Sequence, residues 1–307
     1  MNWKVAGMAG TALATAALTA VSVTAAPSRF TGDVKLAVSQ SWEDDNFGIQ
    51  IFDDSFTSLE GEARVNTGLG GDLNLQLNFK AVGSFTDDNG FFSFDRDASF
   101  QGEADLYWQT DRWAFGPFVG GGVSSGPDLF IFGAPSAEYY YVGVQGQYYW
   151  ETFTLGLAGG WLDSSNDTTI LLSSDEIFLN DAWFVNAEVR WYCSPKTSIT
   201  ANVGYISGEA LKNFVVGPID VDTVHWGAKV EYYPDQNEGL SLWVAYEGRS
   251  TEYDFPGGGS DPDKDVHTGK IGVTWHWGVD GNDARSNDRG GGPVWNPYDF
   301  GAVVVGG

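Results

Sequence analysis

The sequence predicts an all-β fold, a transmembrane antiparallel up-and-down β-barrel of about twelve strands. Three observations predict it: apolar and polar residues alternate with a period of two, the connections between such segments are short and long in turn, and aromatic residues gather at segment ends. In residues 267–278, HTGKIGVTWHWG, the residues Ile271, Val273 and Trp275 share one parity and Lys270 has the other. Successive side chains of a strand point to opposite faces, so this segment has one apolar and one polar face.

The chain begins with a segment typical of secretory signal peptides. Lys4 precedes a weakly apolar stretch rich in Ala and Thr. We expect cleavage after Ala25, which makes residues 1–25 a signal peptide; a retained helical anchor is the alternative. Beyond the first 26 residues there is no run of 18 apolar residues, and this excludes a mature helical membrane protein.

Composition narrows the partners. Among 307 residues, 41 are acidic and 16 basic, a formal net charge of −25 that would repel nucleic acid and attract cations. Cys193 is the only cysteine. Backbone pairing and packing must therefore hold the exported fold without an internal disulfide.

Twelve segments show the period-two pattern, and an even number suits a closed antiparallel barrel. The segment 182–193 shows it clearly, because Trp183, Val185 and Val189 alternate with Glu188 and Arg190. In order, the twelve segments are 31–42, 58–70, 73–85, 98–110, 112–125, 138–150, 153–163, 182–193, 198–208, 222–234, 240–251 and 266–277.

Connection lengths alternate along these segments. Tight turns follow the even-numbered segments, and stretches of roughly 10 to 18 residues follow the odd-numbered ones up to the eleventh. A transmembrane barrel has this asymmetry, with short turns on the periplasmic side and long loops outside the cell. A β-sandwich does not require a strict alternation.

Aromatic residues of the apolar parity lie near the segment ends, which predicts two belts at the membrane–water interfaces. The alternative, a soluble sandwich or closed soluble barrel with these residues in its core, would not confine tryptophan to the strand ends. The predicted aromatic girdle comprises Trp108, Trp113, Trp150, Trp161, Trp183, Trp191, Trp226, Trp275 and Trp277.

Basic side chains indicate which face is inside. Lys or Arg on the lipid face at mid-bilayer costs about 2 to 4 kcal/mol, so the ionic parity is expected to face the lumen. An open strand edge in hydrocarbon would leave backbone groups unsatisfied, so the first segment should pair with the last. The predicted lumen-lining residues are Glu60, Glu62, Arg64, Lys80, Glu103, Asp105, Glu188, Arg190, Lys229, Glu231, Glu247, Arg249 and Lys270.

The bore depends on other inward side chains. Twelve strands lie between the eight-stranded barrels that side chains fill and the sixteen-stranded barrels with an open channel. Bulky inward residues should narrow this bore and glycines should widen it. The bulky residues are Phe118, Tyr141, Tyr233 and Trp243, and the glycines are Gly116, Gly143, Gly160, Gly204 and Gly227.

The closing segment resembles the assembly signal of Gram-negative outer-membrane β-barrel proteins, in particular the porin-like family. That signal has a polar residue, a glycine and two aromatic residues spaced two apart, as Lys270, Gly272, Trp275 and Trp277 are. The resemblance covers residues 31–277 as architecture. It implies the outer membrane of a Gram-negative bacterium and leaves a homo-oligomer open, because porin-like proteins are often trimers, but it names no substrate.

Residues 26–278 form the predicted barrel, and residues 279–307 continue as a C-terminal tail, whereas members of the family usually end at the last aromatic residue of the signal. The tail is rich in Gly, Asp and Asn and turns apolar from Phe300 to Val305. We expect it either to hang in the periplasm or to fold back as a plug. Its composition favours a disordered tail.

Acidic residues gather in the predicted long connections, whereas the lumen mixes both signs. This predicts a narrow channel for passive diffusion of small polar solutes, with a weak, salt-sensitive preference for cations. The alternatives are loops that only solubilise or bridge divalent cations and lipids, and a closed structural or adhesive barrel whose loops bind a partner. The acidic residues are Glu43, Asp44, Asp45, Asp53, Asp54, Asp87, Asp88, Asp95, Asp97, Asp163, Asp167, Asp175, Glu176, Asp181, Asp220, Asp254, Asp261, Asp263 and Asp265.

Other chemistry has weaker support. The stretch 260–265, SDPDKD, has alternating carboxylates but lacks the remaining pattern of a calcium loop, so a solvated turn is the simpler interpretation. Ser250 and His267 share the outward parity at the outer rim and could serve a lipid-directed hydrolase, but no orienting residue stands at a defined spacing. No glycine-rich phosphate cradle opens a helix, so no enzyme, metal or cofactor is predicted.

Overall fold

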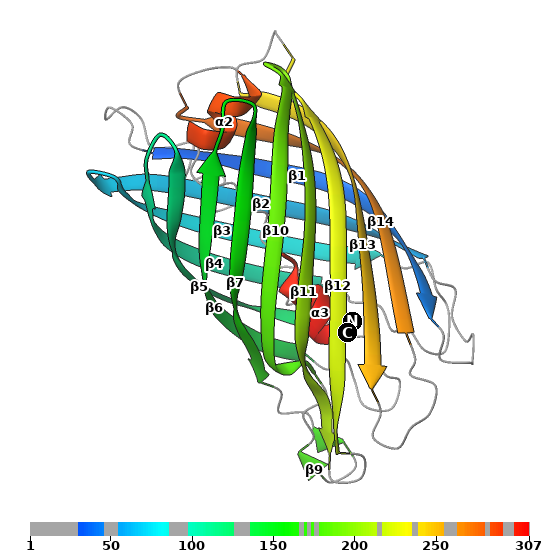
Figure 1. The fold of residues 1–307 in the computed structure, drawn as a ribbon. Helices are drawn as coiled ribbons and strands as arrows, with labels where there is room; N and C mark the ends of the chain where they lie inside the picture. Colours follow the sequence, from blue (N-terminus) through cyan, green and yellow to red (C-terminus); the bar gives the residue numbers. More distant parts are fainter. Residues whose placement is uncertain are drawn as a thin grey trace.

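The computed structural model shows a closed barrel in which every strand pairs antiparallel with two neighbours (Figure 1). The described residues are 30–45, 55–85, 98–125, 136–165, 169–170, 173–174, 178–213, 217–234, 239–254, 263–279, 283–290 and 298–306. The predicted signal peptide lies outside them. The barrel strands are β1 (Phe30–Asp45), β2 (Ser55–Gly70), β3 (Leu73–Phe85), β4 (Ala98–Gln109), β5 (Trp113–Ser125), β6 (Ser136–Tyr149), β7 (Phe153–Ser165), β10 (Asn180–Ser194), β11 (Thr197–Asn213), β12 (Gly217–Tyr232), β13 (Leu240–Asp254) and β14 (Asp263–Trp277).

Two short helices and a small separate sheet complete the described structure. Strands β8 (Thr169–Ile170) and β9 (Ser173–Ser174) form a separate two-stranded sheet. Helices α2 (Ala284–Gly290) and α3 (Phe300–Gly306) follow the last strand. No helix among the described residues is long and apolar enough to cross a membrane.

The barrel closes by pairing its first and last strands, as predicted. Register partners run from Gly32 opposite Trp277 to Asp45 opposite Lys264. Closure leaves no edge with unpaired N–H and C=O groups, which is the condition for a sheet in hydrocarbon.

Side chains alternate between the two faces of the wall, as β10 illustrates. Trp183 and Trp191 are 50% and 51% exposed on the outside, whereas Phe184 and Arg190 are only 3% and 4% exposed on the inside. Valine, leucine, tyrosine and tryptophan dominate the outer surface of the other strands. The chain therefore has the architecture of an outer-membrane β-barrel, with an apolar outside and a largely polar inside.

Tight turns connect the strands at one end, which we call the short-turn end. Only 71–72 separate β2 from β3, 110–112 separate β4 from β5, 150–152 separate β6 from β7, and 195–196 separate β10 from β11. In the first of these turns, Gly71 has a φ of +59°, in the left-handed region that favours glycine. The opposite end, which we call the long-connection end, is where β4, β6 and β10 begin.

One predicted long connection is wrong. The alternation predicts a loop at 209–221, but β11 and β12 continue to Asn213 and from Gly217. Their extension is stabilised inside the barrel, because Ile219 and Val221 are almost fully buried there. Charged residues that alternate with buried apolar residues in this way therefore belong to the strands and not to a loop.

Several acidic residues assigned to long connections also lie in strand ends, because the strands are longer than predicted. Strands in this barrel extend beyond their hydrophobic middle, and the charged residues at their ends still pair with the neighbouring strand. Those in strands are Glu43, Asp44, Asp45, Asp163, Asp181, Asp220, Asp254, Asp263 and Asp265. The others, Asp53, Asp54, Asp87, Asp88, Asp95, Asp97, Asp167, Asp175, Glu176 and Asp261, lie outside the described residues.

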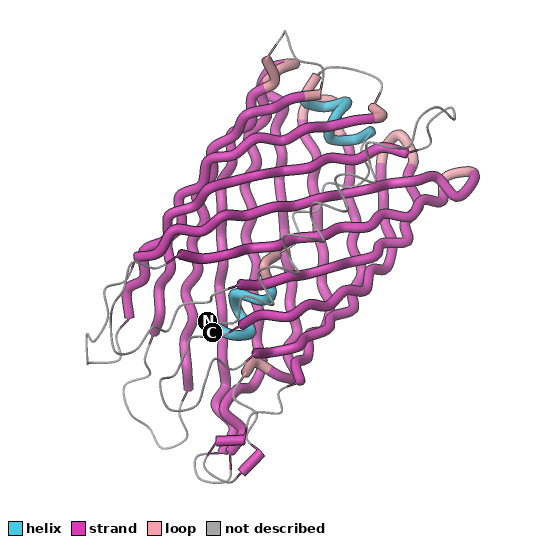
Figure 2. Tube along the Cα trace, turned by 180° about the vertical axis from the view of Figure 1, so that it is seen from behind, coloured by secondary structure: helices cyan, strands magenta, loops and turns pink. Residues whose placement is uncertain are grey.

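The two helices of the C-terminal tail lie within the outline of the barrel (Figures 1 and 2). Helix α2 lies at the short-turn end, and α3 lies further along the lumen. Asp283 caps α2 by accepting the Ser286 N–H at 2.9 Å. Partial burial raises the pKa of Asp283, but hydrogen bonds from Ser286 and the Arg285 N–H outweigh it, so this pKa lies below its ordinary value.

Candidate functional site: the barrel lumen

Buried ion pairs line the lumen on β1, β2 and β3. The Lys35 ammonium lies 2.9 Å from a Glu62 carboxylate oxygen, and Lys80 lies 3.7 Å from the other oxygen of Glu62. On the same wall the Arg64 guanidinium donates to Asp33, and both side chains are nearly inaccessible. Opposite charges at this spacing offset the cost of burying each one.

A second group joins the first strands to the last ones across the closure. Lys270 lies between two carboxylates, 2.9 Å from Glu60 and 2.8 Å from Glu247. Lys229 lies 3.0 Å from Glu231, which also accepts the Ser241 hydroxyl at 2.5 Å. The lumen thus holds bases and acids in contact around its circumference.

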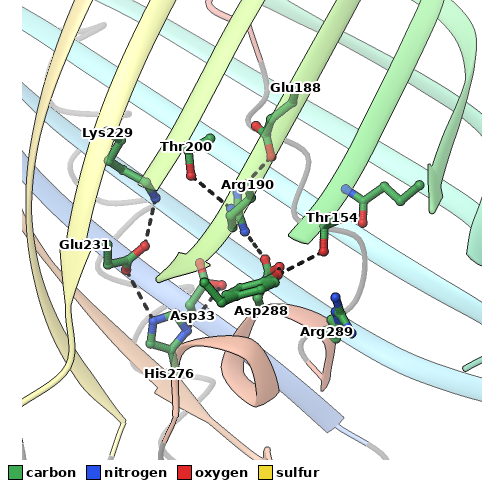
Figure 3. Close-up of polar contacts among 12 residues, drawn as sticks. Asp33, Thr154, Glu188, Arg190, Thr200, Lys229, Glu231, His276, Asp288 and Arg289 are labelled. Carbon is green, nitrogen blue, oxygen red and sulfur yellow. Dashed lines mark hydrogen bonds and ion pairs between the residues drawn. The ribbon is translucent and has the colours of Figure 1, made fainter. Parts of the chain in front are cut away.

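Arg190 connects the wall to the C-terminal tail (Figure 3). Its guanidinium donates to Thr200 Oγ1 at 3.0 Å and to Glu188 Oε1 at 3.0 Å, and it forms a further ion pair with Asp288 of α2. The Tyr192 hydroxyl also donates to Asp288. Asp288 is 6% exposed, so the tail places a buried carboxylate where two wall residues neutralise and bind it.

Glu103 and Asp105 differ from the other charged residues of the lumen, because amides rather than bases surround them. Asn78 donates to Glu103 at 2.9 Å and to Asp105 at 2.6 Å, and Gln145 donates to Asp105 at 2.6 Å. Among the described ion pairs, neither carboxylate has a basic partner. Two acids on one face of β4 are therefore buried side by side without a base.

Helix α2 contacts the ends of several strands at the short-turn end of the barrel. We call this set of contacts the mouth contact. Arg289 donates to the backbone oxygen of Phe153 at 3.1 Å and to that of Trp150. In return Gln109 donates to the Arg289 backbone oxygen at 2.8 Å, and the Ala284 N–H donates to a backbone oxygen in the β10–β11 turn at 2.7 Å. Turns of three different hairpins thereby hold α2.

Helix α3 packs into an apolar part of the inner wall, nearer the long-connection end. The centroid of the Phe300 ring lies 4.5 Å from that of the Tyr141 ring and 4.8 Å from that of the Phe184 ring. Val303 is fully buried. We call this part of the wall the apolar chamber. Its wall residues include Phe118, Ala137, Tyr141, Ala158, Leu162, Phe184, Ile206 and Val221.

Polar wall residues bind the backbone of the same tail segment. Gln101 donates to the Tyr298 oxygen at 3.1 Å and accepts the Phe300 N–H at 3.3 Å, and Arg249 donates to the Ala302 oxygen at 2.5 Å. The His225 ring stacks on Tyr298 with centroids 3.7 Å apart. Gln101 has the inward parity of its segment, but nothing in the sequence indicates that it binds the tail.

A cavity of about 150 Å³ remains beside the tail. Most of the residues around it are polar or charged, and Tyr298, Asp299 and Ala302 of the tail form one side of it. A smaller cavity of about 40 Å³ lies near Lys35 and Arg190. Both are large enough for water molecules.

Of the thirteen predicted lumen residues, eight are buried and the other five are half-buried, on the parity opposite to the exposed apolar residues of their strands. Most take part in the contacts above, and Arg249 binds the tail. Among those that form the ion pairs described above, Glu247 is the most exposed, with a side chain 40% exposed. The bulky inward residues Phe118, Tyr141, Tyr233 and Trp243 are all buried.

The expectation that glycines widen the bore is wrong. A Cβ at Gly143 would lie 2.5 Å from the Phe118 ring, and one at Gly160 would lie 2.7 Å from the Phe184 ring. At Gly204, a Cβ would lie 2.0 Å from the His225 ring. Larger neighbours therefore fill the space that a missing side chain leaves; Gly116 and Gly227 are crowded in the same way by Tyr107 and Asn202.

The girdle tryptophans lie on the outer face. Seven of the nine, from Trp113 at 37% to Trp275 at 61%, are exposed. Trp226 and Trp277 are half-buried, because each packs over a glycine of the neighbouring strand, Gly248 and Gly32.

The pair considered for hydrolysis is not assembled in the described structure. His267 forms its hydrogen bond with the Tyr246 hydroxyl, at 2.7 Å, and Ser250 is in register with Asp265 instead. Residues 260–262 of the SDPDKD stretch lie outside the described residues. Within the described part of the chain, no group of three or more His, Cys, Asp or Glu side chains could hold a metal ion.

No family model matches the sequence, and no curated protein matches it. Solved structures with a similar fold include the toluene transporter TodX of Pseudomonas putida, at 12% identity over 82% of this chain and 90% of that one, with a TM-score of 0.40. An outer-membrane channel of Pseudomonas putida F1 matches at 14% identity over 80% and 95%, with a TM-score of 0.46. The translocator domain of the autotransporter NalP of Neisseria meningitidis matches at 13% identity over 89% and 98%, with a TM-score of 0.45. Likenesses at this level do not identify what a barrel transports.

Proposed function

We propose that the chain is an outer-membrane channel for passive diffusion of small polar solutes, with a weak preference for cations. The observation that carries this proposal is the division of the wall, with paired ions and amides inside and bare aliphatic and aromatic side chains outside. A soluble protein gains nothing from exposing tryptophan while it buries ions, whereas a barrel in a bilayer needs an apolar outer face and keeps its charged side chains inside.

The polar interior of the barrel supports the proposal that the transported solutes are polar. Ion pairs such as Lys35–Glu62 and Lys270–Glu60 border the cavities, and several serine and threonine residues line them as well. With α2 and α3 in place the remaining space is narrow, so we expect a small conductance.

Charge supports the cation preference. The predicted lumen set contains seven acids and six bases, close to neutral, while the whole chain carries a net charge of −25. The excess of acids therefore lies outside this set, where it would concentrate cations within a Debye length of about 8 Å at physiological salt.

The test is the current through refolded protein in a planar bilayer under a potassium chloride gradient. We expect a reversal potential of the sign set by potassium, which decreases toward zero as both salt concentrations rise, because screening weakens surface charge. A detergent-only addition is the control. A reversal potential set by chloride would contradict the cation preference.

The occupied lumen favours one other function, a closed structural or adhesive barrel. In that case α2 and α3 stay in the lumen permanently, and the folded, inserted protein carries no current under any condition.

A further inference from the structure

The inner wall provides matched partners for the C-terminal tail at two separate places. Helix α2 is bound by the mouth contact and by Arg190 and Tyr192, which both bind Asp288. The apolar chamber binds α3 through Phe300, Val303 and Val304, which are 3%, 0% and 2% exposed. A tail resting in the lumen by chance would not bury apolar groups and ions so completely.

The fit of α3 is close at Gly301. A Cβ at this position would lie 3.2 Å from Ser99 Cβ and 3.3 Å from Ser124 Cβ, so glycine lets the helix approach β4 and β5. Gln101 and Arg249 satisfy backbone groups at the two sides of the same segment. The wall therefore combines an apolar pocket with hydrogen-bond partners for one particular peptide.

The tail can leave the lumen without breaking any backbone pairing of the barrel sheet. Strands β1 and β14 close the barrel by pairing with each other, and neither α2 nor α3 contributes a strand to it. Because the tail follows β14 at the short-turn end, withdrawal would occur through that end.

We propose that the inner wall is a peptide-binding surface whose occupants are the chain's own residues 283–290 and 298–306, and that these two segments narrow the channel to a small conductance until they withdraw. The inference rests on the proposed channel function, which supplies the path that the tail narrows. Entry of α3 into the apolar chamber is the step that narrows the channel, and the ion pair of Asp288 with Arg190 holds α2 at the short-turn end.

The first experiment compares the full-length chain with Val303→Asp and Val303→Ile in planar bilayers. An aspartate in the apolar chamber should expel α3 and raise the mean conductance several-fold, whereas isoleucine, which stays apolar, should leave it near the parent value. Heat-dependent gel mobility confirms that each variant is a folded barrel.

The second experiment locks the tail in place in the full-length chain. Cysteines at Ser124→Cys and Gly301→Cys, in a Cys193→Ser background, have Cβ positions 3.3 Å apart, near the mean of about 3.8 Å for disulfides. Combined with Val303→Asp, the oxidised lock should return conductance to the parent value, and a reductant should raise it again. Gly301→Cys without the second cysteine is the control and should not respond to the reductant.

The outcomes separate the two proposals. Equal, measurable currents from the parent and Val303→Asp would preserve the channel and overturn the narrowing role of the tail. No current from either, in folded and inserted barrels, would overturn the channel itself and with it this inference.

Discussion

At the residue scale, the lumen accommodates charge in two ways. Most charged side chains have an opposite partner within about 3 to 4 Å, as Glu188 has in Arg190. Glu103 and Asp105 have amide donors instead, and two like charges next to each other in a buried site repel each other. The free energy of unfolding should respond differently to neutralising a carboxylate in each setting.

We expect Glu103→Gln to raise the free energy of unfolding by about 1 kcal/mol, because the amide still accepts from Asn78 and no longer repels Asp105. Glu188→Gln, the matched change, should lower it by about 1 kcal/mol, because it removes a charged partner of buried Arg190. Urea unfolding of the refolded protein in detergent measures both. A loss of stability in Glu103→Gln equal to that in Glu188→Gln would contradict the distinction.

Parity predicts which way a residue faces but not what it contacts. Lys270 has the inward parity from sequence alone, yet its partner Glu60 is 210 residues away and becomes adjacent only when β1 and β14 close the barrel. The contacts of Gln101 and Arg249 with the tail depend in the same way on a segment whose position the sequence pattern leaves open.

At the element scale, the sequence predicts the barrel strands but not the tail helices. Period two is a local property, so the barrel strands were recognised, and errors are confined to their ends, as at 209–221. Helix α3 reads FGAVVVG, and glycine and valine are weak helix formers. Its conformation follows from packing in the apolar chamber, which short-range sequence patterns do not contain.

Strand β12 offers a test of the two faces at neighbouring positions. Val230→Arg places a charge on the outer face, where Val230 is 42% exposed, and should reduce the yield of membrane-inserted barrel, because a charge facing lipid costs up to about 2 to 4 kcal/mol, with the largest cost at mid-bilayer. Lys229→Val acts on the inner face, where Glu231 keeps its bond to Ser241, so the barrel should assemble and at most change its current. Insertion into liposomes, followed by heat-dependent gel mobility, compares them. Equal tolerance of both changes would contradict the inside and outside assignment.

At the scale of the whole molecule, the outer surface sets how the barrel sits in a membrane. Trp108, Trp113 and Trp191 lie close to the short turns, and Trp161 and Trp183 lie toward the long-connection end. Aliphatic side chains such as those of Val142, Val144, Leu157 and Val203 cover the surface between them. Two aromatic belts around an apolar band match the interfaces and the hydrocarbon core of a bilayer.

Quenching of tryptophan fluorescence by brominated lipids tests this orientation on the folded, inserted protein. Bromines close to the headgroups should quench more strongly than bromines at the chain ends, because the belts lie at the interfaces rather than at mid-bilayer. Trp183→Phe should reduce the quenched fraction, since Trp183 is 50% exposed on the outer face, whereas Trp243→Phe should not, since Trp243 is 9% exposed inside the barrel. Strong quenching by aqueous iodide, with no effect of brominated lipid, would place the tryptophans in water and contradict a bilayer around this barrel.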